Sequence, residues 1–255
     1  MQFIDTHTHL YLPEFDTNRD EVVKRAVNSG VMKMLMPNID FQSVDLMLSA
    51  ESRYPEICSP MIGLHPTSVK EDYLSQLDKL ENLVTKHRFI AIGEIGIDLY
   101  WDKTFLKEQL AAFRRQIAFA IDKGLPVVIH SRESFPEVFS VLDEFERKGL
   151  RGVFHAFSGN IKDAEKAIGM GFKLGIGGIV TFKNSGLDKI VKETGPKNLI
   201  LETDSPYLAP VPYRGKRNES SYICIINKKL AEIFGLSEEE VASIIFTNST
   251  GLFNL

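Results

Sequence analysis

An alternation between short apolar runs and longer amphipathic segments extends along the whole chain and constrains the fold more than any other feature. Eight runs have the length and apolar content of β-strands, and they cover residues 2–8, 31–37, 57–64, 89–97, 126–130, 151–157, 172–177 and 198–203. The segments between them have helical periodicity. One such segment, residues 20–27, places Val22, Val23, Ala26 and Val27 on one face. Parallel strands need crossover connections of this kind, so the pattern predicts a parallel sheet.

Closure of that sheet into a barrel follows from the number of units and from the length of the chain. Eight strand–helix units in 255 residues match the usual size of a (β/α)8 barrel. No glycine-rich phosphate loop follows the first strand, which argues against an open, doubly wound sheet. No linker or low-complexity segment interrupts the chain. We therefore predict a single α/β domain, a (β/α)8 TIM barrel, over residues 1–255.

Charge and cysteine content limit the partners and the compartment. The formal net charge of −4 provides no general attraction to nucleic acids or to anionic membranes. A polyanionic substrate would need a local positive site, which metal ions can supply. Cys58 and Cys224 lack the spacing of a disulfide framework or a zinc finger. Without a signal peptide or a run of about 20 apolar residues, we expect a cytoplasmic monomer that does not contact membranes.

Histidines gather at the ends of the predicted strands. Five of the six lie there, namely His7, His9, His65, His130 and His155. The remaining one, His87, ends a helix among charged residues, and we expect it at the surface. Barrels of this class carry their active sites at the carboxyl ends of their strands, so the distribution indicates a functional site.

Two carboxylates repeat the pattern. Glu94 lies inside the apolar fourth run, where a buried carboxylate is costly without a cation or hydrogen-bond donors. Asp204 follows the last run. His7 and His9 point to the same side of their strand because side chains alternate with a period of two. Each residue alone has a structural explanation, but together we predict that His7, His9, Glu94, His130, His155 and Asp204 bind one or two divalent metal ions.

Six motifs in this chain resemble those of the TatD family of metal-dependent deoxyribonucleases. They are FIDTHTHL at 3–10, IGLHP at 62–66, GEIGID at 93–98, VIHSR at 128–132, HAFSG at 155–159 and LETDSPY at 201–207. They occur in the family's order and span nearly the whole chain. Residues 212–219 resemble the family's basic loop after the last strand. Two departures, Ala156 where the family often has cysteine and Ser220 where it usually has proline, affect no predicted ligand.

The resemblance implies a nuclease that trims single-stranded DNA from the 3′ end. It also implies that His7 and His9 join Glu94 and Asp204 around one metal ion. His130 and His155 would hold a second ion, with Glu94 as the bridge between the two.

Such a centre suits phosphodiester hydrolysis, because two cations offset the charge of the phosphate and lower the pKa of a shared water to about 7. Asp204 is either a ligand alone or also the base that accepts the proton of that water. His65 either contacts the substrate, as a phosphate ligand or as the proton donor to the leaving oxygen, or supports the turn at Pro66. We interpret Asp5 and Glu202 as supporting or capping groups. Imidazole and carboxylate ligands favour zinc, manganese or iron, and magnesium remains open.

Substrate contacts are predicted from the basic and aromatic residues near the strand ends. Arg132 follows His130 closely, and Arg214 and Arg217 form a basic patch with Lys216 after Asp204. Such a small footprint suits DNA as a single strand or a chain end more than a long duplex. Four aromatic residues near the same rim either stack bases or cover the seam between helices and barrel: Tyr100, Trp101, Tyr207 and Tyr213.

Two other functions compete with a nuclease. A hydrolase of the same superfamily would attack an ester, an amide or a lactone, and an aminoacyl-tRNA deacylase would also use the basic loop. A scaffold without enzymatic activity is the second alternative, although a scaffold does not require six metal ligands.

Overall fold

The computed structural model describes residues 1–146 and 148–255 of the chain. Eight strands follow one another in the predicted order: β1 (Phe3–Asp5), β2 (Val31–Pro37), β3 (Cys58–Met61), β4 (Ile92–Asp98), β5 (Val127–Arg132), β6 (Gly152–Phe154), β7 (Lys173–Ile176) and β8 (Leu199–Leu201). Several strands are shorter than the apolar runs that predicted them, because the runs continue into the segments that carry the histidines and carboxylates.

The strands form a closed parallel barrel. One run of hydrogen-bonded strands extends from β1 through β2 to β3, and a second extends from β4 through β5, β6 and β7 to β8. Within each run, every strand pairs in parallel with the next strand along the chain. A parallel bridge between Ile62 and Ile92 connects β3 to β4. A second bridge between Thr8 and Ser205 connects the ends of β1 and β8. The predicted (β/α)8 barrel is therefore confirmed, since no edge between β1 and β8 is left open.

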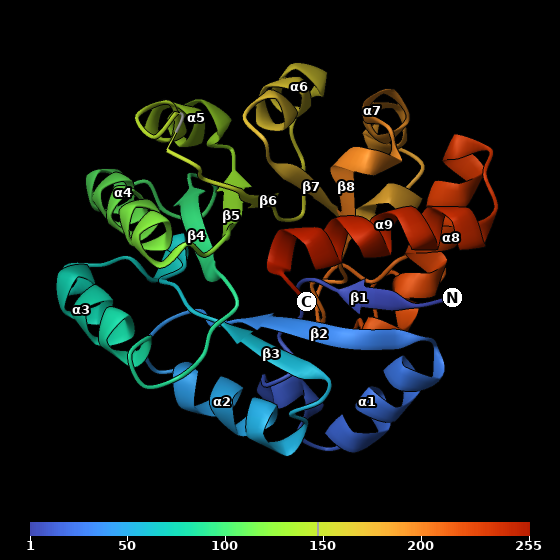
Figure 1. Ribbon diagram of the computed structural model, residues 1–255, viewed down its shortest axis with the longest axis horizontal. Helices are drawn as coiled ribbons and strands as arrows, with labels where there is room; N and C mark the ends of the chain where they lie inside the picture. The colour runs from blue at the N-terminus through green and yellow to red at the C-terminus, as the bar shows by residue number, and fades with distance from the viewer. Residues whose placement is uncertain (147) are drawn as a thin grey trace.

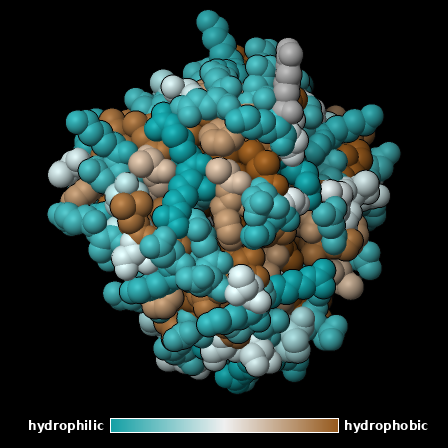
Figure 2. Space-filling view, turned by 60° about the vertical axis from the view of Figure 1, so that its left-hand side comes forward, coloured by the Kyte–Doolittle hydropathy of each residue, from teal (hydrophilic) through white to brown (hydrophobic). Residues whose placement is uncertain are grey.

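Helices surround the barrel (Figure 1). They are α1 (Arg19–Asn28), α2 (Val44–Arg53), α3 (Tyr73–Leu83), α4 (Leu106–Lys123), α5 (Phe135–Asp143), α6 (Ile161–Gly169), α7 (Leu187–Thr194), α8 (Ile223–Phe234) and α9 (Glu238–Phe253). Figure 2 brings the side of α3, α4 and α5 forward and shows hydrophilic side chains spread over it, with hydrophobic ones between them. Within the described residues, no helix has the length and hydropathy needed to cross a bilayer.

The helical pattern in the sequence holds with one exception on α1. Val22, Val23 and Ala26 are buried against the barrel, but Val27 is 45% exposed. Val27 lies at the outer edge of the apolar arc, beyond the roughly 100° that faces the core. The prediction that it shares the buried face was therefore wrong.

Two apolar layers hold the fold together. The larger cluster packs the helices onto the outside of the strands. A separate inner cluster combines seven residues from the strands or their immediate ends with two from α9: Ile4, Leu35, Met61, Ala91, Val128, Val153, Ile200, Leu252 and Phe253. The last turn of α9 thus covers the inner layer, and α9 lies across the centre of the ring in Figure 1. The polar residues of the site lie at the carboxyl ends of the strands.

Candidate metal centre

The barrel brings the six predicted ligands together. His7 and His9 follow β1, Glu94 and His130 lie within β4 and β5, His155 follows β6, and Asp204 follows β8. The carboxyl ends of parallel strands meet on one face of a barrel, which places these side chains around one space. They and His65 form three groups whose donor atoms lie within 4.8 Å of one another: His7 with His155 and Asp204, His7 with His9 and Glu94, and His65 with Glu94 and His130.

Glu94 lies at the centre of this cluster, and its two oxygens face different histidines. Its Oε1 is 2.8 Å from Nδ1 of His130, and its Oε2 is 3.2 Å from Nε2 of His7. The Nε2 of His155 lies 3.9 Å from Oε1. A carboxylate with imidazoles on both sides has the placement that a bridging ligand requires.

The grouping of His155 differs from the division that the family resemblance implies. Its ring stacks on that of His7, with the centroids 3.4 Å apart. Its Nε2 lies 3.7 Å from Oδ1 of Asp204, an oxygen that is also 3.6 Å from Nε2 of His9. His155 therefore lies next to both proposed metal positions, because Glu94 and Asp204 are its neighbours on two sides.

His65 joins the cluster as well, on the side of His130. Its Nε2 lies 3.3 Å from Nδ1 of His130 and 3.5 Å from Oε1 of Glu94. The backbone N–H of Thr67 donates to Nδ1 of His65 at 3.2 Å. The neutral ring therefore carries its proton on Nε2 and directs an N–H into the site. His65 therefore caps the turn at Pro66, the structural role that the sequence left open, and its ring also faces the ligands. Its contact with the substrate stays a prediction.

Buried groups behind the ligands hold them in place. Asp5 accepts hydrogen bonds from the backbone N–H and the hydroxyl of Thr203, at 2.9 and 2.6 Å, and so ties β1 to the end of β8. Glu202 accepts a hydrogen bond from the backbone N–H of Ala156, at 2.5 Å, directly after His155. Both residues therefore support segments that carry ligands, as the sequence interpretation expected.

Two supporting contacts were not anticipated. Tyr11 places its hydroxyl 3.0 Å from Nδ1 of His9 and donates a hydrogen bond to the carbonyl of Pro37. Oδ2 of Asp98 lies 2.9 Å from Nε2 of His130. A signal for Asp98 existed in the sequence, since it follows Glu94 by four residues in the same strand, and residues at this interval share one side. Tyr11 lies beyond the first strand, where this alternation does not apply.

Asp204 has a backbone conformation that residues other than glycine rarely adopt. Its φ is +56°. The backbone N–H of Asp204 donates to the carbonyl of His7 at 2.9 Å, and its own carbonyl accepts from the N–H of Tyr207 at 2.8 Å. Such conformations persist only where surrounding contacts enforce them, and they cluster at functional sites. Here the conformation turns a carboxylate toward the histidines.

The charges of the cluster are strongly interdependent. Burial opposes ionisation of Glu94, but the surrounding histidines, foremost His65 and His155, hold its pKa well below the ordinary value. Burial likewise opposes protonation of His155, yet the carboxylates of Glu202, Glu94 and Asp204 raise the pKa of this ring to about 10. Glu94 and Asp204, whose pKa values are both lowered, are therefore ionised and attract positive charge.

The donor set fits divalent metal ions. Imidazole nitrogens and two ionised carboxylates direct lone pairs into the same space, an arrangement that a cation stabilises. Mixed nitrogen and oxygen ligands suit zinc, manganese or iron. The number and the identity of the ions remain predictions.

An open pocket of about 670 Å³ leads from the cluster to the surface. Trp101 lines it beyond the end of β4, and Arg132 lines it at the last position of β5. Tyr207 and Leu208 line it beyond β8. The guanidinium of Arg132 lies 3.8 Å above the ring of Tyr100. Of the predicted substrate contacts, Arg132, Trp101 and Tyr207 thus line the pocket of the metal centre.

The two arginines of the basic loop have other partners. Arg217 donates a hydrogen bond to the carbonyl of Glu14 at 2.6 Å, and its guanidinium lies over the ring of Phe15. It lines a separate groove between α1 and the start of α8. Arg214 lies over the ring of Phe182, 4.5 Å from the ring centre.

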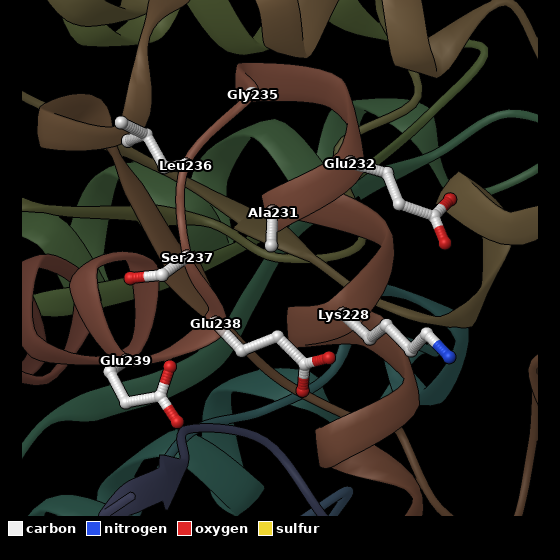
Figure 3. A pocket seen from close by; sticks show the side chains of 8 residues that line it. All are labelled: Lys228, Ala231, Glu232, Gly235, Leu236, Ser237, Glu238 and Glu239. Carbon is white, nitrogen blue, oxygen red and sulfur yellow. The ribbon is translucent and has the colours of Figure 1, made fainter.

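Another hollow lies where α8 turns into α9 (Figure 3). Its ionisable side chains are those of Lys228, Glu232, Glu238 and Glu239. None of the proposed metal ligands lines it. With three carboxylates and one lysine, it is unsuited to a phosphate.

Comparison with known proteins places this geometry in a family. Residues 4–254 match the family model described as TatD-related DNase. An uncharacterised metal-dependent hydrolase of Bacillus subtilis, YabD, is 36% identical over 252 residues, with 98% of each chain covered. A protein of Pantoea vagans named 3′-5′ ssDNA/RNA exonuclease TatD is 32% identical over 258 residues, which cover 98% of this chain and 99% of that protein.

A solved structure agrees with the fold in detail. The crystal structure of YjjV, a TatD homologue from Escherichia coli, superposes with a TM-score of 0.93 at 27% sequence identity. The superposition covers 99% of this chain and 98% of that one. The similarity therefore extends over the whole barrel.

Proposed function

The chain belongs to the family of TatD-related DNases and is a metal-dependent hydrolase, and from this premise we propose that it removes nucleotides from the 3′ end of single-stranded DNA. The observation that carries the proposal is the position of Glu94, whose two oxygens face different histidines at the base of an open pocket. The relative named as a 3′-5′ ssDNA/RNA exonuclease supports the choice of substrate.

The charge distribution supports a phosphate-containing substrate that is recognised through metal ions. The chain carries a formal net charge of −4, and the arginine that lines the pocket is Arg132. Arg214 and Arg217 pack on Phe182 and Phe15. Most of the positive charge that a phosphate needs must therefore come from cations in the metal centre.

We assign one ion to His7, His9, Glu94 and Asp204, and the other to Glu94, His130 and His155. Bound there, the ions supply Lewis-acid charge that offsets the charge of the phosphate and makes a water molecule more acidic. These assignments follow the family motif, and the contacts of Glu94 on both sides support them. His155 is within reach of the second ion through Glu94, 3.9 Å away, although it also lies beside His7 and Asp204 of the first.

Asp204 and His65 have the placement for proton transfer and for orientation of the substrate. The side chain of Asp204 is 14% exposed against 4% for Glu94, so a water in the pocket reaches Asp204 more readily. Histidine charges keep its pKa low despite burial, so it is ionised and can accept a hydrogen bond from that water. His65 directs its Nε2–H into the site and can donate to a phosphate oxygen.

The pocket favours a chain end over a duplex. Its volume of about 670 Å³ lies within the roughly 300–1,000 Å³ of sites that enclose small ligands. Trp101 lines its mouth and can stack on an unpaired base, as aromatic residues do in proteins that bind single strands. Arg132, beside it, is placed to contact the backbone.

A nuclease assay on matched substrates tests the proposal. The substrates are 5′-labelled single-stranded DNA, the same strand with a blocked 3′ end, a circular single strand and a duplex, each with zinc, manganese or magnesium and with a chelator. We expect stepwise shortening of the free strand in metal only. Glu94→Gln serves as the inactive control.

Cleavage of the circular strand would instead indicate an endonuclease. Hydrolysis of an aminoacyl-tRNA or of a simple ester, with all the DNA substrates left intact, would refute the nuclease and indicate the ester hydrolase that the sequence left as an alternative.

A further inference from the structure

Asp98 occupies the last position of β4, between the metal centre and the rim of the pocket. Its side chain is buried, and each of its two oxygens has its own partner. The backbone on which it sits is fixed by Gln109 of α4. The amide of Gln109 accepts from the N–H of Asp98 at 2.9 Å and donates to its carbonyl at 3.3 Å.

One oxygen of Asp98 determines how His130 is presented. Oδ2 lies 2.9 Å from Nε2 of His130, and the other nitrogen of that ring, Nδ1, lies 2.8 Å from Oε1 of Glu94. Both carboxylates can accept a proton from this ring, but only Glu94 belongs to the proposed ligands. In the neutral ring that binds a metal ion through Nδ1, the proton therefore lies on Nε2, where Asp98 accepts it. The lone pair of Nδ1 is then left free on the side of Glu94, where a metal ion would need it.

The other oxygen of Asp98 holds the rim. Oδ1 accepts hydrogen bonds from the backbone N–H groups of Tyr100 and Trp101, at 2.9 and 3.0 Å. Aspartate stabilises turns in this way. The turn carries Trp101, whose side chain is 68% exposed, and the ring of Tyr100, on which the guanidinium of Arg132 stacks.

We propose that Asp98 is a positioning residue that couples the metal centre to the aromatic rim: one carboxylate orients His130 for a metal ion and also fixes the turn that presents Trp101 to the substrate. A shift of the carboxylate toward either partner changes its bonds to the other. Metal binding therefore alters the surroundings of Trp101. By thermodynamic reciprocity, the factor by which the metal changes the affinity for a ligand at Trp101 equals the factor by which that ligand changes the affinity for the metal. The coupling requires a metal ion but does not depend on the identity of the substrate.

Trp101 provides a direct measurement because it is the only tryptophan of the chain. Its fluorescence in metal-free protein, titrated with zinc, reports on the rim in the absence of substrate and of turnover. We expect zinc to change the emission of the wild-type protein with the same midpoint as zinc binding measured by calorimetry.

Two substitutions at Asp98 separate its two contacts. In Asp98→Asn the amide oxygen can still accept from the turn, but the amide nitrogen donates to Nε2 of His130 and moves the ring proton to Nδ1, against the metal. We expect metal-free emission like that of the wild type and zinc binding weakened by about 10–100-fold. In Asp98→Ala both contacts are lost, so we expect altered emission without metal, equally weakened zinc binding and no response of the emission to zinc.

Asp102→Asn is the matched control, because Asp102 lies in the same loop and pairs with Lys70 rather than with a histidine. It should leave zinc affinity and emission unchanged. Wild-type zinc affinity in a folded Asp98→Asn protein would overturn the orienting role. Wild-type emission of Asp98→Ala, with and without zinc, would overturn the coupling. If Asp98→Ala does not fold, Asp98→Asn supplies the test at saturating zinc. A change in Trp101 emission equal to that of the wild type would support the coupling through the retained turn. The absence of any change would overturn the coupling.

Discussion

His155 and Glu202 form a buried ion pair beneath the metal centre, with Nδ1 of the ring 3.1 Å from Oε1 of the carboxylate. Gly175 makes room for this pair, because a Cβ added there would lie 2.3 Å from Oε2 of Glu202. Glycine at this position is therefore a requirement of the site rather than of a turn.

A methyl group at position 175 should disturb metal binding through that carboxylate. We expect Gly175→Ala to displace Glu202 and to weaken zinc binding by about 10–100-fold, the usual effect of losing a group that orients a metal ligand. Gly169→Ala is the control, since a Cβ there meets no atom within 4 Å. Calorimetric zinc titration of both variants checks the prediction, and equal affinities would contradict it.

Replacement of Glu94 should abolish most of the activity. Glu94→Gln keeps the shape of the side chain but removes the charge that faces His7 and His130. We expect kcat to fall by at least about 10³, comparable with the loss of a major electrostatic contribution to the transition state. The exposed His87 lies outside the site, so His87→Ala should retain wild-type turnover. Near wild-type kcat in a folded Glu94→Gln protein would show that Glu94 is not the bridge.

Metal binding should release protons. In the metal-free protein the pKa of His155 is raised to about 10, so the ring is protonated at neutral pH. The resulting stability is present below the unfolded pKa of about 6.5 and is lost as the pH rises through about 10. A metal ion must displace this proton, so we expect about one proton released from His155 per protein and an affinity that rises with pH. Calorimetry in two buffers of different ionisation enthalpy measures the release, and none at pH 7.5 would contradict it.

Metal content is a separate test of the centre. We expect elemental analysis of the purified protein to find one to two equivalents of transition metal, and we expect a chelator to remove the activity. Re-addition of metal should restore it. Activity that persists in a metal-free preparation would exclude the proposed mechanism.

Arg132 and Arg217 should respond differently to removal. Because Arg132 lines the pocket, Arg132→Ala should raise KM for an oligonucleotide more than it changes kcat. The slope of log affinity against log salt concentration should become shallower by about one unit. Arg217 donates a hydrogen bond to the carbonyl of Glu14, so Arg217→Ala should lower the free energy of unfolding by about 1 kcal/mol. Its effect on KM should be smaller than that of Arg132→Ala. Kinetics across a salt series, with thermal melts, distinguish the two. The reverse pattern would favour Arg217 over Arg132 as the substrate contact.

The sequence alone was sufficient for the barrel and for the set of residues that meets at its mouth. Periodicity located every strand, and parallel strands share one polarity, so residues at their carboxyl ends had to gather on one face. The period of two in the predicted first strand likewise indicated that His7 and His9 share one side. Their Nε2 atoms do meet at 3.3 Å, although β1 ends at Asp5. These conclusions need only local pattern and the direction of the chain.

The tertiary structure decided which of those residues touch. The stacking of His155 on His7, the turn of Arg217 toward Glu14 and the double contact of Asp98 were not predicted. Each depends on where a side chain points after its strand has ended, and that direction is set by loop dihedrals and by neighbours that are distant in the sequence. At Asp204 a φ of +56°, held by a hydrogen bond to the carbonyl of His7, turns the carboxylate into the site. A local pattern does not contain that information, because the contact that enforces the conformation exists only once the barrel has closed.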